Sequence, residues 1–98
     1  MNDKQFEWDE NKNSSNKEKH SVDFEFASSV FFDENRIEWQ DNRKNYGEIR
    51  YITIGKIVNS IITVVYTLRD RIIRIISSRP AKNFERELYN NQNKTNED

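Results

Sequence analysis

The stretch that decides the fold is RIIRIISSRPAKNFERELY, residues 71–89. Its first half is dominated by isoleucine, which is typical of a buried strand, although arginines interrupt the strand and cluster at its end. Pro80 suits the first turn of a helix that follows directly. The apolar face of that helix would be formed by Ala81, Phe84 and Leu88. The sequence therefore predicts a strand that runs into a C-terminal helix, with cations at the junction.

Three more strands are expected upstream of this stretch. Residues 48–55 and 60–68 are rich in Ile, Val, Tyr and Thr, and residues 36–40 are a weaker candidate. The dipeptide Arg69–Asp70 is short enough for a tight hairpin before the last strand. Consecutive strands with short links favour antiparallel pairing. The predicted fold class is therefore α+β, a small antiparallel four-stranded sheet with N-terminal helices and a C-terminal helix.

The N-terminal third predicts a short strand and one or two helices. Phe6 and Trp8 lie on one face of the short strand. Asp9 is a suitable N-cap for residues 10–20, which contain no apolar residue and so form a surface helix or a loop. Asp23 can cap a second helix, whose apolar face would be formed by Phe24, Ala27 and Phe31.

The composition limits the class of protein. The 98 residues have room for one domain, expected over residues 1–89, and for a polar tail over residues 90–98. Without cysteine, the chain forms no disulfide and no thiolate zinc site. No apolar run approaches the ~18 residues of a membrane-spanning helix, and the acidic N-terminus is unlike a secretory signal. We expect a cytoplasmic protein with no membrane partner.

Charge is distributed unevenly along the chain. Residues 1–42 contain five Lys or Arg and eleven Asp or Glu, whereas residues 43–89 contain ten and four. The basic part could bind a phosphate backbone although the net charge is −1. The alternative is that the two parts neutralise each other in the folded protein.

Long stretches of the sequence follow the motifs of a known family. FEWDENKNSSNKEKHSVDFEFASSVFFD, residues 6–33, follows F-x-W-D-x-x-K-x-x-x-N-x-x-K-H-G-V-x-F-x-x-A-x-x-V-F-x-D. GEIRYITIG, residues 47–55, follows G-E-x-R-x-x-x-I-G, and residues 64–89 follow V-V-Y-T-x-R-x-x-x-x-R-I-I-S-A-R-x-A-x-x-x-E-R-x-x-Y. Over this range the chain resembles the BrnT toxins, more specifically than a single short motif would. Two positions depart from the pattern: Ser21 stands where it has Gly, and Ser78 where it often has Ala.

This resemblance implies a function that composition and spacing do not. BrnT toxins belong to type II toxin–antitoxin systems, have a fold similar to the RelE/ParE toxins, and act as ribonucleases that stop translation. The resemblance further implies a cognate BrnA-like ribbon-helix-helix antitoxin, with operator DNA bound through that antitoxin. Two alternatives remain open: a non-catalytic module of the same fold that binds antitoxin or RNA, and a gyrase-inhibiting toxin of the ParE type.

Metal-independent RNA cleavage needs few groups. A base takes the proton of the ribose 2′-hydroxyl, an acid protonates the leaving 5′ oxygen, and cations stabilise the phosphorane. Arg79, at the strand-to-helix junction, is the first candidate for the phosphate contact, since a guanidinium binds phosphate oxygens in pairs. Arg50 is second, because it shares a sheet face with Ile52 and Ile54. The alternative for Arg79 is a cation that satisfies a nearby carboxylate, and the alternative for Arg50 is a charge at the rim of the core.

Further candidates follow from residue type and from the resemblance. His20 is the single histidine and so a candidate acid or base by residue type, although it also suits the C-terminus of the first helix. RelE-like toxins use Lys, Arg, Glu or Tyr, which adds three further catalytic candidates: Lys19, Glu85 and Arg86. The expected RNA contacts are Arg69, Arg74, Lys82 and Tyr89. No metal site and no cofactor are expected, because one histidine without cysteine does not make an ordinary zinc site and no glycine-rich phosphate loop is present.

Overall fold

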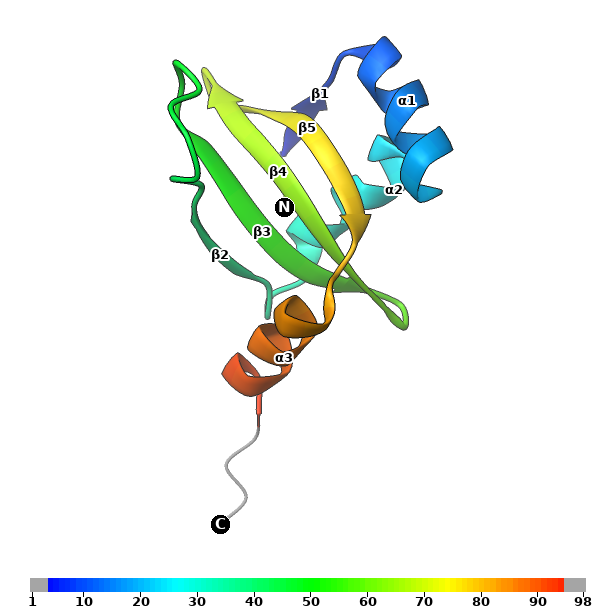
Figure 1. Ribbon diagram of the computed structural model, residues 1–98, viewed down its shortest axis with the longest axis vertical. Helices are drawn as coiled ribbons and strands as arrows, with labels where there is room; N and C mark the ends of the chain where they lie inside the picture. The colour runs from blue at the N-terminus through cyan, green and yellow to red at the C-terminus, as the bar shows by residue number, and fades with distance from the viewer. Residues whose placement is uncertain (1–3, 95–98) are drawn as a thin grey trace.

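The computed structural model describes residues 4–94, which form one five-stranded sheet with helices on it (Figure 1). The strands are β1 (Gln5–Glu7), β2 (Ile37–Gln40), β3 (Arg50–Ile57), β4 (Ser60–Arg69) and β5 (Ile72–Pro80). The helices are α1 (Glu10–His20), α2 (Phe24–Ser28), the 3-10 helix η1 (Ser29–Phe32) and α3 (Asn83–Gln92). The α+β class predicted from the sequence is confirmed.

The sheet differs from the prediction by one strand. In the order β1-β5-β4-β3-β2, the last four strands pair antiparallel as expected. β1 adds a fifth strand that runs parallel to β5, with Phe6 beside Ile73. The four predicted antiparallel strands are therefore present, but the sheet has five strands and is mixed, so the expected four-stranded, RelE-like sheet is not exactly matched. Glu7 and its partner Arg74 are 67 residues apart, so no local pattern indicates this pairing.

The two helix caps predicted for the N-terminal third are confirmed, whereas the predicted start of the last helix at Pro80 is wrong, because Pro80 ends β5 and α3 begins at Asn83. Asp9 accepts hydrogen bonds from the backbone N–H groups of Asn11 at 2.9 Å and Lys12 at 3.4 Å, which settles residues 10–20 as a helix. Asp23 accepts one from Phe26 N at 2.7 Å. α1 ends at Ser21 in the left-handed region with φ of 61°, the position where the BrnT pattern has glycine. At the other end of the chain, α3 continues past residue 89, and residues 95–98 of the expected tail lie outside the described residues.

Tight turns set the register of the hairpins. Because Arg69 pairs with Ile72, the β4–β5 loop is Asp70–Arg71, one residue later than predicted. Both loop residues have positive φ, 51° and 76°, as a type I′ turn requires. The β3–β4 loop begins with Val58, also at positive φ.

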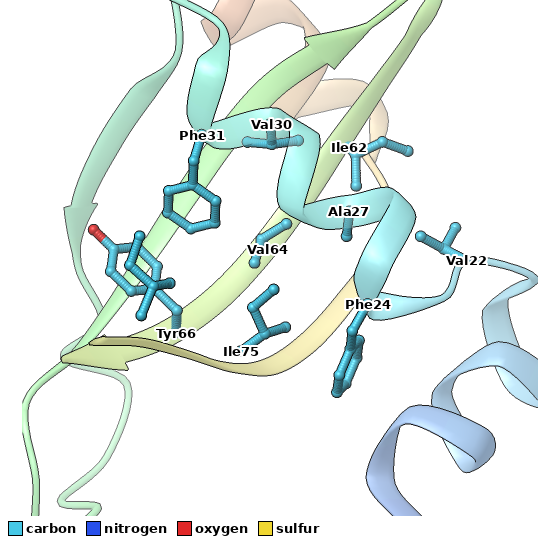
Figure 2. Packing of buried hydrophobic residues seen from close by; sticks show 10 residues of the cluster. Val22, Phe24, Ala27, Val30, Phe31, Ile62, Val64, Tyr66 and Ile75 are labelled. Atoms are coloured by element: carbon cyan, nitrogen blue, oxygen red, sulfur yellow. The ribbon is translucent and has the colours of Figure 1, made fainter. Parts of the chain in front are cut away.

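The main core lies between the sheet and the α2–η1 segment, a side that we call the covered face. Figure 2 shows Phe24, Ala27, Val30 and Phe31 against the strand side chains Ile62, Val64, Tyr66 and Ile75. The rings of Phe31 and Tyr66 meet edge to face at 4.9 Å. Gly55 permits this close packing, since a Cβ there would lie 2.7 Å from Val30 Cγ1.

The opposite side of the sheet, which we call the open face, is crossed by helix only at one end, where α3 lies (Figure 1). Strand register arranges its side chains in rows. One row contains Trp39, Ile52, Val65 and Ser77, and the next contains Ile37, Ile54, Thr63 and Arg79. A third row contains Arg50, Thr67 and Arg74. The predicted face of Arg50, shared with Ile52 and Ile54, is confirmed. No helix among residues 4–94 is long and apolar enough to cross a membrane.

Candidate active site

The strand-to-helix junction holds a buried ion pair. Arg79, near the end of β5, donates from Nη1 to Glu85 Oε1 at 2.7 Å and from Nη2 to Glu85 Oε2 at 2.9 Å. Glu85 is 2% exposed and also accepts from Thr63 Oγ1 and from the backbone N–H of Lys82, the N-cap of α3. Arg79 therefore does satisfy a nearby carboxylate, which is the alternative role predicted for it from the sequence.

This pairing keeps the Glu85 carboxyl ionised. Burial raises the pKa of the Glu85 carboxyl, but the hydrogen bonds from Arg79, Lys82 N and Thr63 outweigh it, and the pKa is lowered overall. Glu85 is therefore a carboxylate at neutral pH whose oxygens are already occupied by donors. A carboxylate in this state orients Arg79 well and is a weak candidate for accepting a proton.

Arg79 keeps one edge of its guanidinium for another ligand. Glu85 takes the end formed by Nη1 and Nη2, and Nη1 also approaches the Pro80 carbonyl at 3.4 Å. Nε and the outer hydrogen of Nη2 form a second fork, and Nε has no acceptor among residues 4–94. Such a fork matches two phosphate oxygens.

A second arginine, not singled out from the sequence, is held in the same manner. Arg43 donates from Nε and Nη2 to the two oxygens of Asp41, at 2.7 and 2.8 Å. The Asp41 side chain is fully buried, whereas that of Arg43 is 62% exposed. Bonds from Arg43, with a further one from Tyr46, lower the pKa of Asp41 to about 2 despite its burial. Here Nη1 has no acceptor among the described residues 4–94.

A pocket on the open face joins the two arginines. It has a volume of about 340 Å³ and is lined by residues of β2, the loop after it, β3, β4, the end of β5 and α3. Its lining includes Trp39, Asp41, Asn42, Arg43, Ile52, Val65, Arg79, Lys82, Phe84 and Glu85. The predicted residues Arg79, Lys82 and Glu85 are brought together here. Trp39 was not predicted as a site residue. Strand alternation puts Trp39 on the same sheet face as Ile37, but the four residues of β2 alone do not indicate which face that is.

The other predicted arginines lie on or beside the open face, and each has a carboxylate partner. Arg50 pairs with Glu48 at 3.0 Å and lies over the Tyr46 ring at 4.2 Å from its centroid. Arg69 approaches Glu48 at 3.8 Å. Arg74 pairs with β1 through Glu7 at 3.3 Å, an ion pair that links the acidic and basic parts of the chain. None of these three lines the pocket of Arg79.

Three catalytic candidates lie on the other side of the β5 end. His20 and Arg86 line one pocket of about 360 Å³ together with Pro80. His20 and Lys19 line another, between α1 and the β5 edge. Arg86 is partly committed locally, because its guanidinium donates to Ala81 O at 2.6 Å and to Asn83 Oδ1. The six catalytic candidates therefore occupy three places, with Arg50 alone at the far end of β3.

Tyr89 is placed as an anchor of α3. It is 5% exposed, and its hydroxyl donates to Asp33 Oδ2 at 2.6 Å. Burial and this bond raise the pKa of Tyr89 to about 12. The hydroxyl thus ties α3 to the residue that follows η1, and it is not presented to the open face.

Comparison with known families decides the identity of this arrangement. The sequence model of a protein family described as the ribonuclease toxin BrnT of type II toxin–antitoxin systems matches residues 8–85. The chain belongs to the BrnT family. The BrnT match ends at Glu85, so it includes both carboxylate–arginine pairs of the pocket. A search of curated proteins gave no match. Among residues 4–94, no three His, Asp or Glu side chains come together as a metal site would require.

Proposed function

We propose that this BrnT-family protein is a metal-independent endoribonuclease that cleaves RNA in the cytoplasm and inhibits translation. The observation that carries the proposal is the Arg79–Glu85 pair: a buried carboxylate holds the guanidinium by one end, Nε has no acceptor among residues 4–94, and Arg79 lines a pocket. A preorganised cation of this kind stabilises charge that develops on a phosphorane without reorganising during the reaction.

RNA cleavage by the ribose 2′-hydroxyl needs only proton transfer and stabilisation of negative charge. The ribose 2′ oxygen attacks the adjacent phosphorus and loses its proton to a base. The bond from phosphorus to the 5′ oxygen breaks, and an acid supplies the proton that this oxygen takes up. The products are a 2′,3′-cyclic phosphate and a 5′-hydroxyl end. In this scheme Arg79 binds the non-bridging oxygens, Lys82 adds charge at the same pocket, and Glu85 positions Arg79.

The acid and base remain to be chosen among the predicted groups. Glu85 is disfavoured because its oxygens already accept four hydrogen bonds. His20 and Lys19 lie beyond Pro80, in pockets on the other side of the β5 end. RNA that passes over this end would meet Arg79 first and His20 next. We therefore propose His20 as the group that exchanges a proton with the RNA, with Lys19 as its alternative.

Cleavage of single-stranded RNA in the presence of EDTA tests the proposal. We expect fragments that end in 2′,3′-cyclic phosphate, and a rate that falls about 100-fold or more in Arg79→Ala. Arg79→Lys should recover little activity, because an ammonium cannot bind Glu85 and phosphate through two forks. Arg71→Ala is the control, since Arg71 is an exposed cation of the β4–β5 turn, lies away from the pocket and is not among the expected RNA contacts. Equal cleavage by the wild type and Arg79→Ala would refute the assignment.

The partner proposed for this protein is a BrnA-like ribbon-helix-helix antitoxin that covers the basic side of the β5–α3 junction and connects the toxin to operator DNA. If an acidic antitoxin segment replaces phosphate there, affinity should fall as salt concentration rises. Affinity that does not depend on salt would indicate apolar docking instead. Inhibition of a cell-free translation reaction, relieved by the antitoxin, would complete this test.

One observation favours a second function, a binding module without catalysis. The arginines Arg50, Arg74 and Arg79 all have carboxylate partners, as structural cations do. A wild-type protein that binds antitoxin or RNA but cleaves no RNA, with or without ribosomes, would support this function. A gyrase supercoiling assay separates the ParE-like alternative, which predicts inhibition in the absence of any RNA cleavage.

A further inference from the structure

We propose that Trp39 and Phe84 form a nucleobase subsite for single-stranded RNA, next to the phosphate contact of Arg79. The inference rests on the proposed ribonuclease function and adds to it the part of the substrate that this pocket would recognise. It concerns the aromatic side chains of the open face, which the cleavage chemistry does not use.

Trp39 and Phe84 are exposed aromatic side chains that belong to a pocket. They are 37% and 57% exposed, yet both line the pocket that holds Arg79. Ile52 and Val65, directly beside Trp39 in one row across the sheet, form an apolar floor. At about 340 Å³, the pocket is at the small end of the roughly 300–1,000 Å³ typical of ligand pockets. An apolar floor with exposed aromatic walls suits a flat aromatic ligand.

The charges around the pocket select nucleic acid as the source of that ligand. Arg79 and Lys82 lie at the α3 end and Arg43 at the other, so cations flank the aromatic side chains. The two carboxylates of the lining, Asp41 and Glu85, are already bound bidentately by arginine. A base between two phosphates presents the complementary pattern. Single strands expose the faces of their bases for stacking, whereas a duplex does not.

The spacing across the sheet fits a nucleotide between these groups. Trp39 and Arg79 belong to adjacent rows, so they are separated by three strand intervals of about 4.8 Å across the sheet and by two residues of about 3.3 Å along it, or roughly 16 Å between backbones. Both side chains line the pocket, and so they reduce this gap from either side. A base over Trp39 could therefore remain connected to a phosphate on Arg79.

Binding of RNA that cannot be cleaved tests the subsite without depending on catalysis. The probes are short, fluorescent 2′-O-methyl homopolymers of A, C, G and U, which lack the attacking hydroxyl. Trp39→Ala should weaken binding of the best probe roughly 5- to 150-fold, the effect of losing one stacked base. The slope of affinity against salt should not change, because no charge is removed. Arg43→Ala should instead reduce that slope by about 0.7 per lost phosphate contact.

The controls separate stacking from folding. Trp39→Phe keeps a ring and should restore most of the affinity, and Phe84→Ala should weaken binding in the same range. Phe26→Ala is the matched control, because Phe26 is 46% exposed but belongs to α2 on the covered face. It should bind as the wild type does.

Each outcome bears on a different proposal. Loss of affinity in Trp39→Ala with an unchanged salt slope supports the subsite, even if no RNA is cleaved. Unchanged affinity in that variant overturns it, and so does a wild type that binds none of the four probes. Weakened antitoxin binding with unchanged RNA binding would assign the pocket to a protein segment and also overturn it. Binding without cleavage of ordinary RNA would refute the ribonuclease proposal alone.

Discussion

The two faces of the sheet differ in how much of each is covered by helix. The covered face packs aromatic and aliphatic groups, and Phe24 and Val64 on it have no exposed area. The open face carries Arg50, Arg74 and Arg79, each paired with a carboxylate. Apolar burial is the main stabilising contribution in a small domain, whereas exposed ion pairs add little. We therefore expect the stability of the fold to depend mainly on the covered face and RNA recognition to depend on the open face.

The largest expected effect tests the covered face directly. Phe24→Ala removes a fully buried ring that packs against Trp8 at 6.1 Å between centroids. We expect a loss of about 3–5 kcal/mol in the free energy of unfolding, measured by chemical denaturation. Phe84→Ala, the matched change on the open face, should cost less than about 0.5 kcal/mol. Equal losses in the two variants would break the comparison.

Glu85→Gln tests whether one open-face charge is nevertheless structural. The amide would direct its NH₂ group at a donor in place of a carboxylate oxygen, and it would leave Arg79 without its counter-charge. Because Arg79 is partly exposed, we expect a loss of about 2–3 kcal/mol, below that of a fully buried pair. The free energy of unfolding and the rate of RNA cleavage should both fall.

The matched change for that variant is Glu48→Gln at the other end of the open face. Glu48 pairs with Arg50 at 3.0 Å, but both side chains are partly solvated. Less than about 1 kcal/mol should be lost there. If Glu48→Gln lost more stability than Glu85→Gln, solvent exposure would not determine how much each ion pair contributes to the free energy of unfolding.

Much of the fold could be predicted from the sequence because its signals are local. Asp9 and Asp23 cap helices through bonds that reach two or three residues. The apolar spacing of Phe24, Ala27 and Phe31 identified their buried face. The parallel pairing of β1 could not be predicted, since three residues carry no information about a partner far along the chain.

The site could be predicted only in part, for the same reason. Arg79 was identifiable because it stands at a strand-to-helix junction within a family motif. Its pairing with Glu85 depends on how α3 turns back onto the sheet, which residue spacing does not specify. Asp41 and Arg43 were missed because a polar segment such as DNRKN is typical of an exposed loop. The burial of Asp41 comes from tertiary packing.

Lowering the pH should have a smaller effect on stability, through Asp41, the other carboxylate of the pocket. The pKa of Asp41 is about 2 in the folded protein, against a model-peptide value of 3.8. Since the unfolded chain binds this proton more readily, stability from Asp41 is present above pH 3.8 and is lost as the pH falls toward 2. The difference of about 1.8 in pKa corresponds to about 2 kcal/mol.

Asp41→Asn measures that contribution. The variant should be less stable than the wild type at pH 7, and the difference between their unfolding free energies should shrink as acid protonates Asp41. Asp23→Asn is the control, because Asn caps a helix about as well as Asp does. A difference that stays constant down to low pH would mean that Asp41 acts through packing rather than through its charge.

The smallest expected effect is a gain in stability, from a substitution directly after α1. Ser21 has φ of 61°, where a residue with a Cβ is strained and glycine is not. Ser21→Gly should therefore stabilise the protein by about 0.5–1 kcal/mol. Ser28→Gly, at a helical φ of −60°, should destabilise it by a similar amount.

Ser21→Gly also sharpens the comparison of the two faces, because Ser21 follows His20, which lies outside the open-face pocket. If His20 exchanges a proton with RNA, release of the strain beside it should change the pH profile of cleavage as well as thermal stability. If only stability rises, recognition and chemistry both belong to the open face. His20 would then be a helix-terminal cation, and a proton donor would have to be sought around Arg79 and Lys82.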